Sequence, residues 1–321
     1  MPNQDEPQKT VKDRAKEKLR RDLGGLIEDA LNDPKTVEIM LNADGCLWQE
    51  KLGEAMCCIG HISEGRAEAI IKTVAGFHGK EVTRCQPLLE GELPIDGSRF
   101  AGQLPPIVPR PTFAIRKKAI SVFSLVEYVD SKIMTVNQCR VIKKAVKEHK
   151  NILVVGSTGS GKTTLVNAII NEMVDQSPEE RVFIIEDTGE IQCKAENSVQ
   201  YHTTLDVDMT QLLKTTLRMR PDRILVGEVR GSEALDLLDA WNTGHEGGAA
   251  TLHANSALSG LTRLKSLITR NPASPAEIEP LIGEAVHMVV QIRRTATGRK
   301  VDEIIAINGF ENGQYKIEKL A

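Results

Sequence analysis

The chain has 321 residues, which predicts about two domains, and its 40% hydrophobic and 26% charged residues are typical of a globular protein with real cores. A formal net charge of −3 and only 3% aromatic residues argue against a nucleic-acid surface built from basic and stacking side chains. The sequence has no apolar run near the roughly 18 residues of a membrane span and no hydrophobic signal core, so we expect a cytosolic protein.

The cysteines show no C-x-x-C pair, which argues against a zinc site. In a reducing compartment we expect all of them to be free thiols. They are Cys46, Cys57, Cys58, Cys85, Cys139 and Cys193.

The N-terminal segment is unusually basic. Residues 1–10 are predicted to be disordered. Two interpretations of the basic residues stay open: contact with anionic lipid or another acidic surface, and a solvated helix face with a frayed end, which we favour. The cations are Lys9, Lys12, Arg14, Lys16, Lys18, Arg20 and Arg21, against the acids Asp5, Glu6, Asp13 and Glu17.

Residues 11–120 are predicted to form a small α+β domain. Apolar spacing and turn residues define its elements. These are a helix over 11–31 interrupted at Gly24-Gly25, strands over 37–41 and 46–48 around a turn, a helix over 64–77 capped by Ser63, and punctuated strands through about Arg116.

Residues 121–135 are predicted to be a linker, and 136–321 a larger α/β domain in which strand and helix signals alternate. Its short, nearly all-apolar runs are typical of parallel strands buried on both faces. The predicted elements are a helix over 136–148, strands over 151–155, 181–185 and 223–226, a helix opened by a capping box at 274–277, and strands over 288–292, 301–307 and 315–317 with a turn at Asn312-Gly313.

The segment 156–164 reads G-S-T-G-S-G-K-T-T and fits the phosphate-loop motif G-x-x-x-x-G-K-[ST] between a strand and a helix. Its glycines let backbone amides approach phosphates, and the following helix directs its positive end to the anion. Lys162 is predicted to reach the β- and γ-phosphates of ATP, and Thr163 to hold Mg²⁺. The predicted nucleotide-binding residues are Gly156, Ser157, Thr158, Gly159, Ser160, Gly161, Lys162, Thr163 and Thr164.

Acidic residues follow two of the predicted strands. Glu228 follows the apolar strand 223–226, where an acid is placed to hold Mg²⁺ or to orient water. Capping of the next helix is the alternative, and we favour the catalytic role. The turn 186–190 holds three carboxylates, whose repulsion is tolerated where cations bind. Glu186 and Glu190 are both candidate water-activating bases, and a solvated acidic turn is the alternative.

Two histidines frame a glycine-rich loop and a strand in the segment 243–256. Imidazoles at His245 and His253 are predicted to sense the γ-phosphate or to link the sheet to a moving domain. A metal site is disfavoured, because no third ligand has suitable spacing.

Taken together and in this order, these blocks resemble the signatures of the secretion and pilus traffic ATPases of type II and type IV secretion. The blocks are the phosphate loop, E-D-T-G-E at 186–190, L-R-M-R-P-D at 217–222, V-G-E-V-R at 226–230 and T-L-H-A-N-S at 251–256. The resemblance implies a RecA-like P-loop domain, hydrolysis of MgATP, and a homo-oligomeric, hexameric ring at the inner face of the inner membrane that drives a secretion or conjugation machine.

The short N-terminal module and the lack of a cysteine-rich insertion resemble the type IV secretion branch, and within it the conjugal transfer ATPases of the TrbB type. The alternatives are a pilus assembly or retraction motor, a nucleic-acid translocase, which the composition disfavours, and a nucleotide-binding subunit without turnover. No sequence-specific nucleic-acid binding is expected.

The resemblance also implies roles for individual residues. Glu190 matches the water-activating acid and Glu228 the acid of the Walker B block. Arginines of the N-terminal domain approach the γ-phosphate in the family, and Arg99 and Arg116 match them better than Arg110, although each alternatively pairs with surface carboxylates. The predicted catalytic residues are therefore Lys162, Glu190, Glu228, His245, His253, Arg99 and Arg116, with Thr163 and Glu228 as metal ligands.

Overall fold

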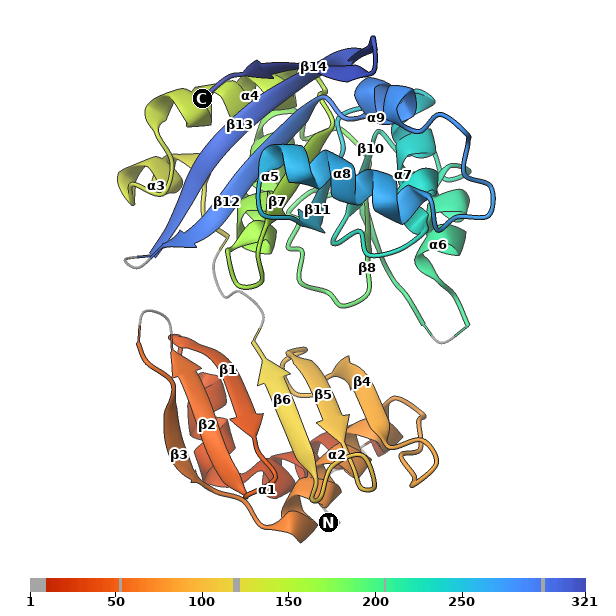
Figure 1. The fold of residues 1–321 in the computed structure, drawn as a ribbon. Coiled ribbons are helices and arrows are strands. Elements are labelled where there is room, and N and C mark those ends of the chain that lie inside the picture. The colour runs from red at the N-terminus through yellow and green to blue at the C-terminus, as the bar shows by residue number, and fades with distance from the viewer. Residues whose placement is uncertain (1–9, 52–53, 118–121, 205, 296–297) are drawn as a thin grey trace, which may run out of the picture. The chain divides into compact units, whose positions relative to one another are not determined.

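The computed structural model describes residues 10–51, 54–117, 122–204, 206–295 and 298–321 (Figure 1). The chain divides into two compact units, Met1–Ile120 and Ser121–Ala321. Apart from Thr10, the segment expected to be disordered lies outside the described residues. In the part of the chain that the structure describes, no helix is both long and apolar enough to cross a membrane.

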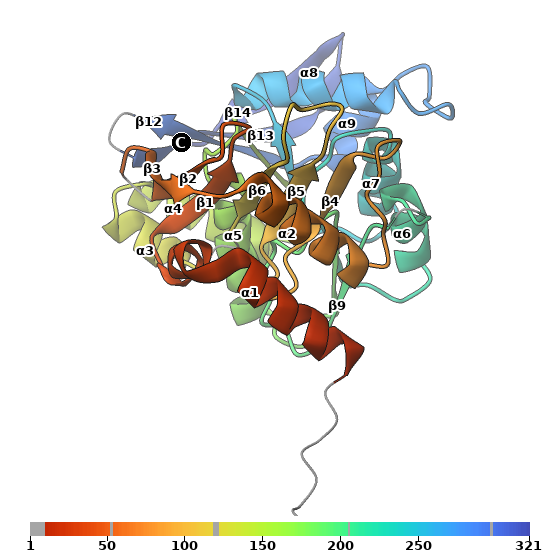
Figure 2. The same cartoon turned by 90° about the horizontal axis from the view of Figure 1, so that it is seen from below.

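The first unit is a six-stranded antiparallel sheet in the order β3-β2-β1-β6-β5-β4. Its elements are α1 (Val11–Asn32), β1 (Thr36–Leu41), β2 (Cys46–Lys51), β3 (Cys57–His61), α2 (Glu64–Phe77), β4 (Leu88–Glu92), β5 (Arg99–Gln103) and β6 (Thr112–Arg116). Helices α1 and α2 lie side by side on one face of this sheet (Figures 1 and 2), where an aliphatic core joins them to the strands.

Helix α1 is kinked at Gly24, which confirms the predicted interruption. Gly24 has a φ of 59°, a value that favours glycine. A β-carbon there would lie 1.6 Å from Nη2 of Arg66, and Nε of Arg66 donates to the carbonyl oxygen of Asp22 at 2.5 Å. The kink therefore makes room for a side chain of α2 that satisfies a carbonyl next to the break.

The cysteine prediction is wrong for one pair. Cys46 and Cys58 form a disulfide, whereas Cys57, Cys85, Cys139 and Cys193 are free. The cause is strand pairing: β2 and β3 are antiparallel neighbours, which brings the two α-carbons to 6.3 Å across a separation of 12 residues. A pairing that depends on register gives no local sequence signal.

The second unit is an eight-stranded sheet in the order β14-β13-β12-β7-β11-β10-β8-β9, parallel from β12 to β9. Its elements are α3 (Leu125–Asp130), α4 (Val136–Lys147), β7 (Ile152–Gly156), α5 (Lys162–Gln176), β8 (Val182–Glu186), β9 (Ser198–His202), α6 (Met209–Thr216), β10 (Arg223–Val226), α7 (Glu233–Asn242), β11 (Ala249–His253), α8 (Ala257–Ile268), α9 (Glu279–Ala285), β12 (Met288–Thr295), β13 (Gly298–Glu311) and β14 (Gln314–Lys319).

Helices cover both faces of this sheet. One core cluster joins the strands to α3, α4 and α5, and a second joins them to α6, α7, α8 and α9. Strands β7, β8 and β10 are buried at every residue, as expected for parallel strands covered on both faces. The predicted α/β fold of this domain is thus confirmed.

The segment 121–135, predicted to be a linker, contains a short helix. Residues 125–130 form α3, which begins with a capping box between Ser124 and Glu127. Its Leu125 and Tyr128 are buried in the core of the second unit. So short a helix has too few turns to show periodicity, and packing rather than propensity stabilises it.

The capping box proposed at 274–277 does not start a helix, because α9 begins at Glu279. Residues 275–277 are exposed and the first buried side chain is that of Ile278, so a helix starting earlier would have no apolar face to bury. The C-terminal hairpin is confirmed. Asn312 and Gly313 at its turn have φ values of 53° and 77°, the geometry that an Asn-Gly hairpin turn requires.

Asn151, just before β7, is fully buried (0% exposed) and connects three segments. Its Oδ1 accepts from the backbone N–H groups of Gly247 (2.8 Å) and Gly248 (3.0 Å), and its Nδ2 donates to the carbonyl oxygen of Ala285 (2.8 Å). We predict that Asn151→Ala lowers the free energy of unfolding of the second unit by about 3 kcal/mol, because three backbone groups lose their partners.

The measurement is urea unfolding followed by Trp241 fluorescence in a Trp48→Phe background, since the chain has two tryptophans. Asn137→Ala, at an exposed position of α4, is the matched control, with an expected change below about 0.5 kcal/mol. Equal effects of the two substitutions would contradict the prediction.

Candidate functional site

The segment between β7 and α5 has the geometry of a phosphate-binding loop. Strand β7 ends at Gly156 and α5 begins at Lys162, with Gly161 as its N-cap. Gly159 and Gly161 have φ values of 70° and 95°, which disfavour other residues. A β-carbon at Gly156 would lie 2.3 Å from the carbonyl oxygen of Ile292. The predicted strand, glycine turn and helix are all present, and the loop fits a polyphosphate anion.

Lys162 and Thr163 open helix α5 with their polar groups at the site. Nζ of Lys162, a residue only 7% exposed, donates to the carbonyl oxygen of Ser157 at 3.1 Å and lies 3.2 Å from Nδ1 of His253. Oγ1 of Thr163 donates to Oε2 of Glu190 at 3.3 Å. An ammonium group and a hydroxyl group therefore flank the start of the helix, as nucleotide binding requires.

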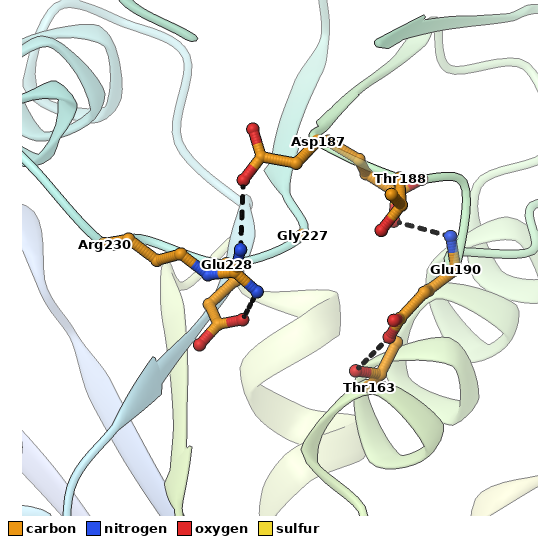
Figure 3. A pocket seen from close by; sticks show the side chains of 8 residues that line it. Thr163, Asp187, Thr188, Glu190, Gly227, Glu228 and Arg230 are labelled. Carbon is orange, nitrogen blue, oxygen red and sulfur yellow. Dashed lines mark hydrogen bonds and ion pairs between the residues drawn. The ribbon is translucent and has the colours of Figure 1, made fainter. Parts of the chain in front are cut away.

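The parallel strands β7, β11, β10 and β8 are neighbours, so their carboxyl ends meet at one edge of the sheet. A pocket lies at this edge. In Figure 3, Thr163 and Glu190 stand on one side of it, and Glu228, Arg230 and Asp187 on the other. The residues that line it are Thr163, Glu186, Asp187, Thr188, Glu190, Gly227, Glu228 and Arg230.

A chain of polar contacts runs along this edge from the lysine of the loop. His253 accepts from Lys162 through Nδ1 and places Nε2 2.7 Å from Oε1 of Glu228. Oε2 of Glu228 pairs with Nη2 of Arg230 at 2.5 Å, and Nη1 of Arg230 lies 3.3 Å from Oδ2 of Asp187. His253 thus joins the phosphate loop to the acid after β10, and its role in sensing the γ-phosphate stays a prediction.

The structure separates the two candidate bases, Glu186 and Glu190. Glu186 is 2% exposed, and its Oε1 accepts from the backbone N–H groups of Glu190 (3.1 Å) and Ile191 (2.9 Å). Its Oε2 accepts from Nε2 of Gln200 at 2.9 Å. Burial raises the pKa of Glu186 to about 7, although these hydrogen bonds oppose the shift. Glu186 therefore holds the turn, whereas the carboxylate of Glu190 contacts Thr163.

The carboxylates and Thr163 suit a hard cation that keeps some of its water. Among the described residues, no group of three or more His, Cys, Asp or Glu side chains is arranged to hold a metal ion. Mg²⁺ does not need such a cage, because it is commonly bound by one or two protein oxygens together with phosphate oxygens and water. Thr163 and Glu228 both line the pocket, and their role as metal ligands stays a prediction.

His245 is not brought to the site. In the pairing of β11 with β7, Ala249 lies opposite Ile152 and His253 opposite Gly156, so His253 is at the loop end of the strand. His245 precedes β11 and lies beyond its other end, more than about 13 Å away at the usual rise per strand residue. The register of β11 therefore does not bring His245 to the loop of its own chain, and its predicted role stays a prediction.

The predicted arginines of the first unit share one row of its sheet. Arg99 on β5 lies opposite Arg116 on β6, and Arg116 lies opposite Glu38 on β1. Burial raises the pKa of Glu38, whereas the charge of Arg116 acts to lower it. Arg110 lies outside this row, and its Nε is 3.9 Å from Oε2 of Glu64. The roles of Arg99 and Arg116 toward a nucleotide stay predictions.

Two arginines at the site were missed by sequence reasoning. Arg230 belongs to the V-G-E-V-R block, and its position two residues after Glu228 is a usable signal. Arg299 lies far along the chain, and its Nε donates to the carbonyl oxygen of Gly159 at 3.4 Å. No sequence motif marks it.

This site and sheet define the class of P-loop α/β nucleotide-binding domains. The model of the family "Type II/IV secretion system protein" matches residues 97–306, and the chain belongs to this family. It is 49% identical over 304 residues to the conjugal transfer protein TrbB of Rhizobium radiobacter, covering 95% of this chain and 94% of that protein. It is 50% identical over 301 residues to a probable conjugal transfer protein TrbB of Sinorhizobium fredii, covering 94% and 92%.

Solved structures agree with this fold. The VirB11 ATPase of the Brucella suis type IV secretion system superposes with a TM-score of 0.50 at 25% identity, over 92% of this chain and 96% of that one. The pilus retraction motor PilT superposes with a TM-score of 0.61 at 19% identity, over 91% and 81%, a likeness that concerns the fold alone.

The raised pKa of Glu186 predicts a pH-dependent stability. The folded state holds this proton more tightly than the unfolded state, because the pKa of Glu186 is raised to about 7 from its ordinary value of 4.5. The stabilisation is therefore complete below about pH 4.5 and is lost as the pH rises through about 7. We predict that the nucleotide-free protein loses up to about 3 kcal/mol over this range relative to Glu186→Gln.

Urea unfolding at pH 5 and pH 8 measures this difference. Glu196→Gln, an exposed carboxylate in the segment before β9, is the matched control and should follow the wild type. A pH dependence that is the same in the Glu186→Gln variant and the wild type would contradict the assignment.

Proposed function

We propose that the protein hydrolyses MgATP and powers a conjugative type IV secretion machine. The observation that carries the proposal is the arrangement at one sheet edge, where Thr163 at the end of the phosphate loop lines one pocket together with Glu190 and Glu228. The similar TrbB proteins are conjugal transfer proteins, and the family is that of type II/IV secretion system proteins, which supports the conjugal and secretion parts of the proposal.

The loop 156–164 binds the phosphates through its backbone amides, and Lys162 pairs with the β- and γ-phosphates. Thr163 and Glu228 hold Mg²⁺, which neutralises charge on the phosphates. Because Lys162 contacts His253 and His253 contacts Glu228, a phosphate that draws Lys162 away changes the partners of Glu228 as well.

Glu190 is the residue that orients the attacking water and accepts its proton. Its carboxylate is held beside Thr163, at the start of the helix that faces the phosphates. Glu186 is a positioning residue for this step, because it fixes the backbone of the turn at Glu190 and Ile191. Glu186 is less suited to be the base itself, since backbone and side-chain donors occupy both of its oxygens.

ATP hydrolysis is coupled to movement by a ring of identical subunits. The ring has six subunits in the family that the sequence resembles. Arg99 and Arg116 close the first unit over the γ-phosphate of the same or a neighbouring subunit, where bidentate guanidinium pairing stabilises the developing charge. Closure in one subunit shifts the next and transmits force to partners in the inner membrane, at whose cytoplasmic face the ring works.

We predict that Lys162→Ala abolishes ATP turnover and strongly weakens ATP binding, with the fold intact by circular dichroism. Glu190→Gln is expected to keep binding but to lower turnover by at least about 100-fold, because the proton acceptor is lost. Phosphate release and calorimetry measure the two effects. Lys147→Ala, an exposed lysine of α4, is the control. Normal turnover in Lys162→Ala would overturn the site.

A second prediction concerns the assembly. Light scattering with MgATP is expected to detect a species of about six times the 35.3 kDa chain mass. The same measurement on Lys162→Ala shows whether nucleotide drives assembly. A strict monomer for the wild type at every protein concentration, with and without MgATP, would contradict the ring.

A further inference from the structure

Arg299 lies directly against the phosphate loop, although it comes from the hairpin of β12 and β13. Its Nε donates to the carbonyl oxygen of Gly159, and a β-carbon at Gly161 would lie only 2.8 Å from its Cδ. The side chain of Arg299 therefore packs against the phosphate loop from Gly159 to Gly161.

The hairpin holds Arg299 at this place by firm contacts. Strand β12 pairs in parallel with β7, with Gln291 opposite Val155, so the hairpin continues the same sheet as the loop. The carbonyl oxygen of Ile292 abuts Gly156 so closely that only glycine fits there. On the other strand, the N–H of Val301 donates to the carbonyl oxygen of Ile133. The position of the Arg299 guanidinium group is therefore set by the paired strands of the sheet.

The charge of Arg299 is poorly compensated. Among the described residues it has no ion-pair partner within 4.0 Å, and its Nη1 and Nη2 groups have no hydrogen-bond acceptor, whereas Arg293 of the same hairpin pairs with Asp302 at 3.0 Å. Arg230, the other arginine at this edge, has two carboxylate partners. A half-buried guanidinium whose terminal N–H groups remain available, beside a loop shaped for phosphate, is suited to bind an anion.

We infer that Arg299 is a further nucleotide-binding residue, whose guanidinium contacts the polyphosphate from within the same chain. This inference rests on the proposed function, because it takes the loop as the site of a nucleotide. It adds a cation of the second unit that is independent of Arg99 and Arg116 of the first unit. The contact is with phosphate rather than with the base, because it is the loop glycines that Arg299 touches.

The test is calorimetric binding of ATP, GTP and inorganic pyrophosphate, each with Mg²⁺, in a Glu190→Gln background that stops turnover. Arg299→Ala is expected to weaken all three by about tenfold, the effect of losing one charged hydrogen-bond donor. Arg299→Lys keeps the charge but not the Nε contact with Gly159, and it is expected to bind within about threefold of the parent.

Two reference variants make the outcome decisive. Lys300→Ala removes the next cation of β13, whose side chain points to the opposite face, and should leave binding unchanged. Lys162→Ala reports on the site itself: if it retains the parent affinity, the proposed function fails whatever Arg299 does. Thermal unfolding without nucleotide confirms that each variant is folded.

Three results would overturn the inference while leaving the proposed function standing. In the first, Arg299→Ala binds within about twofold of the parent although Lys162→Ala does not. In the second, Arg299→Lys is as weak as Arg299→Ala, which is what a residue that only supports Gly159 would give. In the third, the loss is seen for ATP but not for pyrophosphate, which would place the contact at the base.

Discussion

The site depends on the alignment of four parallel strands whose carboxyl ends meet at one sheet edge. Strands β7, β11, β10 and β8 bring Gly156, His253, Gly227 and Glu186 to that edge in this order. The contact between Lys162 and His253 joins residues that are 91 positions apart in the sequence. A shift of one residue in any pairing would turn these side chains away, so the buried, nearly all-apolar strands that set the register also set the chemistry.

Buried polar side chains stabilise turns at both ends of the parallel strands by accepting hydrogen bonds from their backbone N–H groups. Glu186 accepts two backbone N–H groups of the turn at 190–191, and Asn151 does the same for the turn at 247–248, at the opposite edge of the sheet. Each side chain is at most 2% exposed, so its hydrogen bonds are made without competition from water. The two turns differ in what they carry, because only the first bears a side chain, Glu190, that faces the pocket.

Much of this organisation was predictable from local sequence. The strand–loop–helix at 151–170, the acids after two strands and the final hairpin each have a signal within a few residues. Local sequence is uninformative where tertiary packing decides. Helix α3 is too short for periodicity, and the pairing of Cys46 with Cys58 depends on strand register. The same register separates His253 from His245. Arg299 gave no signal at all, since its contact with Gly159 is created by the return of a distant hairpin.

The charges at the sheet edge also bear on the form in which a nucleotide binds. Carboxylates of Asp187, Glu190 and Glu228 line the pocket together with Arg230, whereas Lys162 and Arg299 contact backbone carbonyl groups of the loop. Arg230 is already paired with Asp187 and Glu228, so its charge is largely offset before a polyphosphate with three to four negative charges binds. A nucleotide alone would leave phosphate oxygens facing carboxylates, and a divalent cation between them removes that repulsion. The acids at this edge therefore favour a nucleotide that arrives with its metal over the bare anion.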